Sequence, residues 1–148
     1  MNDNRARSIL WRAAVAEWLG EELEMQKFIT PRPYLLKIKN LPDDFEQGMV
    51  WGLGSGGSGI DVLLNARTDL KWEVSNQVDR SRTEAELDNK TLYFSLQKRS
   101  KKVFADPADS LVFTDGHCLL EVLKRLRKLA AYEKAEAAAQ AAERLEAS

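Results

Sequence analysis

The residues best suited to carry out chemistry are two carboxylates, Asp61 and Glu73, which lie twelve positions apart in the chain. We predict that the stretches around them, GIDVLL and LKWEVS, form neighbouring strands joined by the turn NARTD. Carboxylates brought together in this way could hold Mg²⁺, a hard cation that takes oxygen ligands. Lys71 would share the face of Glu73, because side chains alternate along a strand. The competing interpretation is a hairpin whose charged side chains face water.

The spacing of these residues resembles the core of the PD-(D/E)xK nuclease family. The resemblance implies that Asp61 and Glu73 are metal ligands, that Mg²⁺ is the cofactor, and that Glu21 or Glu22 adds a third acid. In the family, a lysine two residues after the glutamate helps to activate the attacking water. Ser75 occupies that position here, so the lysine named above would have to substitute for it. The resemblance implies a metal-dependent nuclease or an inactive descendant of one.

A glycine-rich stretch, WGLGSGGSG, precedes the first of these two segments and holds five of the eight glycines. Gly54, Gly56 and Gly59 match the pattern G-x-G-x-x-G. A dinucleotide-binding loop of that pattern opens a helix, whereas the strand-like IDVLL follows here, and no Lys-Ser/Thr pair supports a Walker loop. We therefore predict a flexible loop over 52–59, with an engineered GSGGSG linker at 54–59 as the alternative.

Basic residues form two clusters that could follow a phosphate backbone. The first, in QKRSKK, comprises Lys98, Arg99, Lys101 and Lys102, and the second comprises Lys124, Arg125, Arg127 and Lys128. We expect Tyr93 to point outward beside the first cluster, where its ring could stack on a base. The alternative is an ordinary solvated surface, because acidic groups elsewhere bring the net charge to -1.

The chain has a single histidine, His117, and a single cysteine, Cys118. These counts exclude an intramolecular disulfide and argue against zinc, which usually takes three or four such ligands. Cys118 is predicted in the first turn of a helix, where it is either a reactive thiol or a small core residue. A reducing compartment fits this cysteine content.

Composition indicates a soluble globular protein and one domain over 1–148, with 44% hydrophobic and 30% charged residues. No apolar run approaches the roughly 18 residues of a membrane-spanning helix. The polar start MNDNRARS lacks the apolar stretch of a secretory signal. We expect a cytoplasmic protein with no membrane partner.

The pattern of apolar residues predicts an α+β fold: an N-terminal helix, an antiparallel meander of five or six short strands and a long C-terminal helix. The first helix, over 5–27, would bury a stripe of Trp11, Val15, Trp18 and Leu19. The predicted strands include 34–39, 70–75 and 91–97. A polar connection over 76–90, with one helical turn near 83–87, leaves no helix-length segment between strands, so parallel crossovers are not expected.

The last helix, which begins near Thr114 or Asp115, carries the strongest apolar stripe of the chain and then thins to alanine, glutamate and lysine. We expect 132–148 to be an extension that is exposed or binds a partner. The interpretation that follows is a non-enzymatic interaction protein (an adaptor, inhibitor or assembly factor, of bacterial or phage accessory type) without a cofactor. It would bind a protein or a second copy of itself through Leu126, Leu129, Tyr132 and the basic clusters. The alternatives are the Mg²⁺-dependent nuclease and a nucleic-acid-binding protein.

Overall fold

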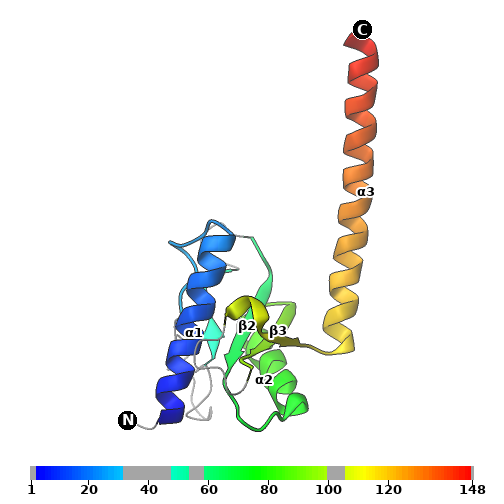
Figure 1. Ribbon diagram of the computed structural model, residues 1–148. Coiled ribbons are helices and arrows are strands. Elements are labelled where there is room, and N and C mark those ends of the chain that lie inside the picture. Colours follow the sequence, from blue (N-terminus) through cyan, green and yellow to red (C-terminus); the bar gives the residue numbers. More distant parts are fainter. Residues whose placement is uncertain (1–2, 32–47, 54–58, 100–105, 148) are drawn as a thin grey trace. The chain divides into compact units, whose positions relative to one another are not determined.

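A computed structural model describes residues 3–31, 48–53, 59–99 and 106–147. The chain divides into two compact units, Met1–Asp115 and Gly116–Ser148. The described elements are α1 (Asp3–Glu22), β1 (Met49–Val50), β2 (Val62–Arg67), α2 (Val74–Leu87), β3 (Leu92–Gln97), the short 3₁₀ turn η1 (Pro107–Asp109), β4 (Leu111–Phe113) and α3 (Gly116–Ala147) (Figure 1). The expected α+β class, with a helix near each end of the chain, is confirmed.

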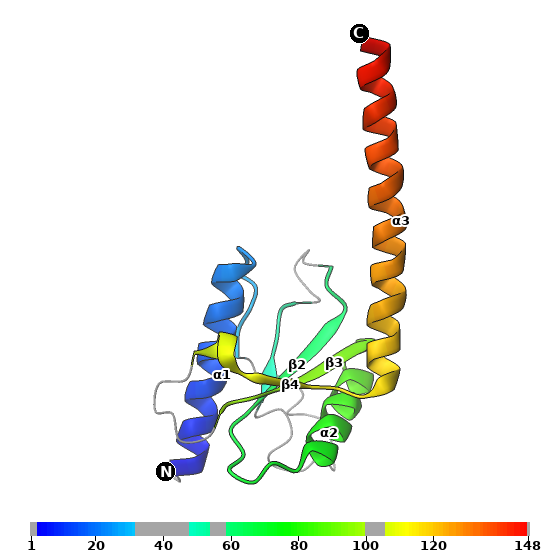
Figure 2. The ribbon, with the colours of Figure 1, turned by 45° about the vertical axis from the view of Figure 1, so that its right-hand side comes forward.

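The described strands form one mixed sheet in the order β1-β2-β3-β4 (Figure 2). The central pair, β2 and β3, is parallel, with Val62 opposite Leu92 and Arg67 opposite Gln97. The two outer pairs, β1 with β2 and β3 with β4, are antiparallel. The predicted meander of five or six antiparallel strands is therefore wrong. The strand predicted over 34–39 lies outside the described residues.

The parallel pair exists because α2 forms the crossover between β2 and β3. The segment 70–75, predicted as a strand, instead leads into α2, with Glu73 at its N-cap position. Leu70 and Trp72 are 63% and 39% exposed, so their alternating pattern does not mark a buried strand face. The helix was missed because Gln77, Ser81 and Glu84 occupy much of its buried face, where the apolar-periodicity test requires large hydrophobic residues.

The apolar core of the first unit lies between α1 and one face of the sheet. Its buried members are Trp11, Val15, Ala16, Ile29, Val50, Leu53, Leu64, Ala66 and Leu96. The indole Nε1–H of Trp11 donates to the carbonyl oxygen of Leu96 at 3.2 Å, which ties α1 to the C-terminal end of β3. Trp18 and Leu19 pack against the same cluster and are partly buried. The predicted apolar stripe of the first helix is thus confirmed.

A close backbone contact joins the segment after α1 to the segment after β1. Thr30 and Trp51 exchange two backbone hydrogen bonds of 2.9 and 2.8 Å. Gly52 follows with φ +108°, and a Cβ at this position would overlap the carbonyl of Phe28. Glycine is therefore required here by both the backbone conformation and the lack of space.

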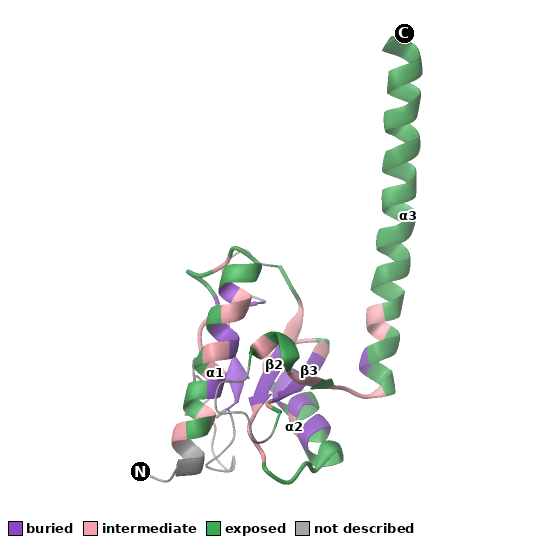
Figure 3. Cartoon of the chain, viewed as in Figure 1, coloured by how far each residue is buried: buried purple, intermediate pink, exposed green. Residues whose placement is uncertain are grey.

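Figure 3 shows where burial is concentrated: in α1, the sheet and one side of α2 within the first unit. In α3, by contrast, every residue from Leu123 to Ala147 is exposed. No helix within the described part of the chain is both long and apolar enough to cross a membrane.

Candidate functional site

The exposed surface of α3 carries the largest group of apolar side chains in the described chain that the structure leaves in contact with solvent. Its members are Leu119, Leu120, Leu123, Leu126, Leu129, Tyr132 and Leu145, all between 50% and 77% exposed. A contiguous apolar patch that is left uncovered usually marks a binding site, so it matters which of these side chains share one face of the helix. The helix is 32 residues long, so at about 1.5 Å per residue it extends roughly 48 Å.

Helix geometry sorts these residues into one narrow stripe and several outliers. At about 100° per residue, Leu119, Leu123, Leu126 and Ala130 fall within a sector of roughly 60°. Leu129 lies about 60° beyond Leu126 and therefore outside that sector. We call the four residues of the sector the leucine stripe, and Leu129 lies beside it.

Tyr132 does not belong to the leucine stripe, although the sequence grouped it with Leu126 and Leu129. Six residues separate it from Leu126, which places it about 120° away around the helix. Its ring is 67% exposed on a different side of α3. Tyr132 therefore serves better as a reference position than as part of the same surface.

The basic cluster of α3 surrounds the leucine stripe without interrupting it. Lys124, Arg125, Arg127 and Lys128 each lie at least about 100° from Leu126. Lys124 Nζ lies 3.3 Å from Glu121 Oε1, an exposed pair of a kind that adds little stability. The sector that holds Leu119, Leu123 and Leu126 therefore contains none of these four cations.

The other basic cluster is only partly described. Lys101 and Lys102 lie outside the described residues. Lys98 follows the end of β3, and Arg99 donates from Nε to the carbonyl oxygen of Asp109 at 2.8 Å. The expectation that Tyr93 points outward beside them is wrong, because Tyr93 is 6% exposed and its hydroxyl donates to Asp115 at 2.5 Å. This part of the chain therefore offers no stacking platform at Tyr93.

The carboxylates Asp61 and Glu73 are not brought together. Asp61 precedes β2, where its Oδ1 accepts the backbone N–H of Thr91 at 2.8 Å. Glu73 lies beyond the other end of β2 and accepts from Asn76 Nδ2 at 2.9 Å. The six residues of β2 between them span roughly 20 Å, whereas ligands of one Mg²⁺ lie about 2 Å from the ion. The predicted pairing on adjacent strands is wrong because the second strand is absent.

The remaining residues of the nuclease interpretation do not complete a metal site either. Lys71 is exposed in the connection to α2, and Glu21 and Glu22 are exposed in the last turn of α1. Within the described residues, no three side chains among His, Cys, Asp and Glu gather closely enough to hold a metal ion.

Asp88 is an acid whose pKa clearly departs from its ordinary value. It follows α2 and lines a shallow hollow with Trp51, Val62 and Lys90. Burial raises the pKa of the Asp88 carboxyl above 3.8, and the charge of Lys90 opposes this shift only in part. The carboxylate also stands at the C-terminal end of α2, where the helix dipole disfavours negative charge.

The glycine-rich loop contributes no described phosphate-binding geometry. Gly54 and Gly56 lie outside the described residues, and Gly59 has φ +66° in open space. The thiol of Cys118, in the first turn of α3, is buried, as the alternative of a small core residue expected.

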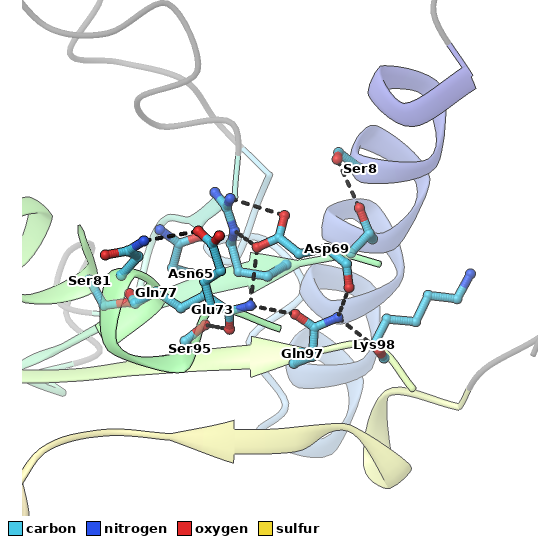
Figure 4. A network of polar contacts seen from close by, with 12 residues as sticks. Ser8, Asn65, Asp69, Glu73, Gln77, Ser81, Ser95, Gln97 and Lys98 are labelled. Atoms are coloured by element: carbon cyan, nitrogen blue, oxygen red, sulfur yellow. Dashed lines mark hydrogen bonds and ion pairs between the residues drawn. The ribbon is translucent and has the colours of Figure 1, made fainter. Parts of the chain in front are cut away.

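A polar layer between α2 and the parallel strands is the feature that sequence reasoning missed (Figure 4). Gln77 is its centre: Nε2 donates to Gln97 Oε1 at 2.8 Å and to Asp69 Oδ2 at 3.1 Å, and Oε1 accepts from Ser95 at 3.2 Å. One helical turn away, Ser81 donates to the backbone oxygen of Gln77 at 3.0 Å.

The same layer continues to a buried carboxylate. Glu84 Oε2 accepts from Asn65 Nδ2 at 2.6 Å, and both residues are fully buried. The hydroxyl protons of Ser81 and Ser95 are both engaged in hydrogen bonds, so neither serine is arranged as a nucleophile. The layer fixes α2 on the sheet. Its signal in the sequence was the spacing of Gln77, Ser81 and Glu84, which repeats every three to four residues as a buried helix face does.

No protein-family model, curated protein or solved structure matches this chain.

Proposed function

We propose that the chain is a non-enzymatic interaction protein whose docking element is α3. The observation that carries this proposal is the leucine stripe, in which Leu119, Leu123 and Leu126 are all about half exposed. An exposed leucine side chain does not make a solvated helix more stable than alanine would, because alanine forms helices equally well or better. Burial against a partner is the role that gives these side chains a free-energy benefit.

The distribution of charge supports the same proposal. The basic residues of α3 lie to the sides of the stripe and behind it, so a partner helix or groove could cover the leucines without burying an unpaired charge. Leu119, Leu123 and Leu126 have the spacing i, i+4 and i+7. A helix that binds in an apolar groove presents its anchor residues at this spacing.

The nuclease and nucleic-acid alternatives receive less support from the geometry. The two carboxylates of the former lie at opposite ends of a strand, and the stacking residue of the latter is buried.

Site-specific photo-cross-linking in the native cell tests the proposal. A benzophenone amino acid replaces either Leu126, in the stripe, or Tyr132, which is also exposed and lies about 120° away around the helix. We expect a discrete covalent adduct from position 126 and none, or a much weaker one, from position 132. The adduct from position 126 should disappear when Leu123→Glu is added to the same chain. Equal adducts from both positions, or none from either, would contradict the proposal.

A further inference from the structure

The second half of α3 continues the face of the leucine stripe, but with small and polar residues. Steps of four and three residues lead from Leu119 through Leu123, Leu126 and Ala130 to Glu133, Ala137 and Gln140. This is the alternation of a heptad seam, in which one side of a helix faces one partner over several turns. The seam therefore has a bulky half and a small half within one helix.

Charge divides at the same place. Residues 116–132 contain four basic and one acidic residue, whereas residues 133–147 contain four acidic and two basic residues. The basic half is the leucine half, and the acidic half is the alanine half. A helix that must pair with this surface should carry the opposite order of both size and charge, and α3 read in the reverse direction has that order.

We infer that the partner of α3 is α3 of a second copy of this chain, arranged antiparallel. This inference rests on the proposed function, since it names the partner of the same surface. With the crossing point between Ala131 and Tyr132, Leu126 of each copy lies opposite Ala137 of the other, and Ala130 lies opposite Glu133. At these two levels a larger side chain meets alanine, which allows the helices to approach closely near the crossing point. At the outer levels Leu123 lies opposite Gln140, and Leu119 lies opposite Arg144.

Polar seam residues select this direction over the parallel one. A parallel pair would place Glu133 directly opposite Glu133 of the second copy, with the two basic halves also side by side. Like charges facing each other across a seam disfavour pairing, and polar residues at seam positions are a known determinant of helix orientation and register. The antiparallel pair separates the two Glu133 carboxylates along the axis and sets each basic half beside an acidic half.

Disulfide trapping of the purified full-length chain tests both the partner and the direction. Two variants, Leu126→Cys and Ala137→Cys, are mixed and oxidised with a glutathione buffer; the native Cys118 is buried in the structure and provides the background in the wild-type chain. We expect the 126–137 heterodimer to form at least tenfold faster than either homodimer. Circular dichroism of each variant, matched to the wild-type spectrum, establishes that the helices are retained.

Each outcome has a definite meaning. Preferential 126–126 homodimers would overturn the antiparallel arrangement. Disulfides no faster than the Cys118 background, together with a monomeric native mass, would overturn the second copy as partner. Photo-cross-linking at position 126 to a different protein would then still uphold the proposed function, so the two failures are distinguishable. Higher salt should weaken the antiparallel dimer, because its halves attract each other electrostatically.

Discussion

Replacing Gln77 with leucine should destabilise the first unit by about 2–4 kcal/mol, even though the substitution puts a more hydrophobic residue at a buried position. Gln77 is 4% exposed and takes part in three side-chain hydrogen bonds. Leucine is of similar size, so no large cavity forms. Two of the former partners, Gln97 Oε1 and the hydroxyl of Ser95, would stay buried without their hydrogen bonds, at about 1–2 kcal/mol each. Asp69 is partly exposed and can turn to water.

Urea unfolding followed by tryptophan fluorescence measures this effect without interference from α3, because all four tryptophans, at positions 11, 18, 51 and 72, belong to the first unit. A loss of 2–4 kcal/mol corresponds to a fall in Tm of roughly 8–16 °C for a unit of this size. Asp79→Leu, a polar-to-leucine change at an exposed position of α2, is the control and should stay within about 0.5 kcal/mol of wild type.

A double variant separates polarity from packing. Adding Ser95→Ala to Gln77→Leu removes one of the two orphaned groups and should restore about 1 kcal/mol, because an absent hydroxyl needs no partner. If Gln77→Leu alone leaves the unfolding free energy unchanged, the polar layer does not hold α2 on the sheet and the reasoning fails.

Two further predictions concern single positions in the first unit. Gly52→Ala should destabilise the first unit by at least about 3 kcal/mol in the same urea assay, because the φ of Gly52 is +108° and the new Cβ would overlap the Phe28 carbonyl. Gly59→Ala, at φ +66° in open space, should destabilise it by only about 1–2 kcal/mol. Asp88→Asn should raise Tm at pH 7 but should not raise it below pH 3.8. A carboxyl whose pKa is raised in the folded state favours folding at low pH, and this contribution to stability is lost as the pH rises through the folded-state pKa. A Tm increase that is the same at both pH values would contradict the assigned role of burial.

The elements predicted correctly are those in which burial and hydrophobicity coincide. Trp11 and Val15 repeat with helical spacing and are buried, so α1 was visible in the sequence. The alternation of Leu92, Phe94 and Leu96 also predicted β3, although the opposite face of that strand, with Ser95 and Gln97, is buried and polar. Periodicity of apolar residues is a reliable signal wherever an apolar core is what fixes an element.

The errors arise where a buried surface is polar. In α2, Gln77, Ser81 and Glu84 occupy positions that a pattern search expects to be apolar, so a helix was interpreted as a connection. That one omission removed the crossover, converted a parallel pair into a predicted meander, and placed Glu73 on a strand beside Asp61. The loss of the carboxylate pair as a candidate site is thus a direct consequence of the polar face of α2.

The two helices α2 and α3 invert the usual relation between polarity and burial. In α2, polar side chains are buried because strands of the same unit supply matching hydrogen-bond groups, and this directional bonding fixes one position of the helix on the sheet. In α3, leucines are exposed, and non-directional apolar contacts alone would let a partner helix slide or reverse. In the dimer, the polar seam residues Glu133 and Gln140 would act as Gln77 does in the first unit. They would favour one orientation of the two helices over others that bury a similar apolar area. On this reasoning, Glu133→Leu should strengthen self-association and should lower the preference for the 126–137 disulfide over the 126–126 disulfide. If the dimer became tighter and this preference stayed the same, the charge at position 133 would not set the direction of the helices.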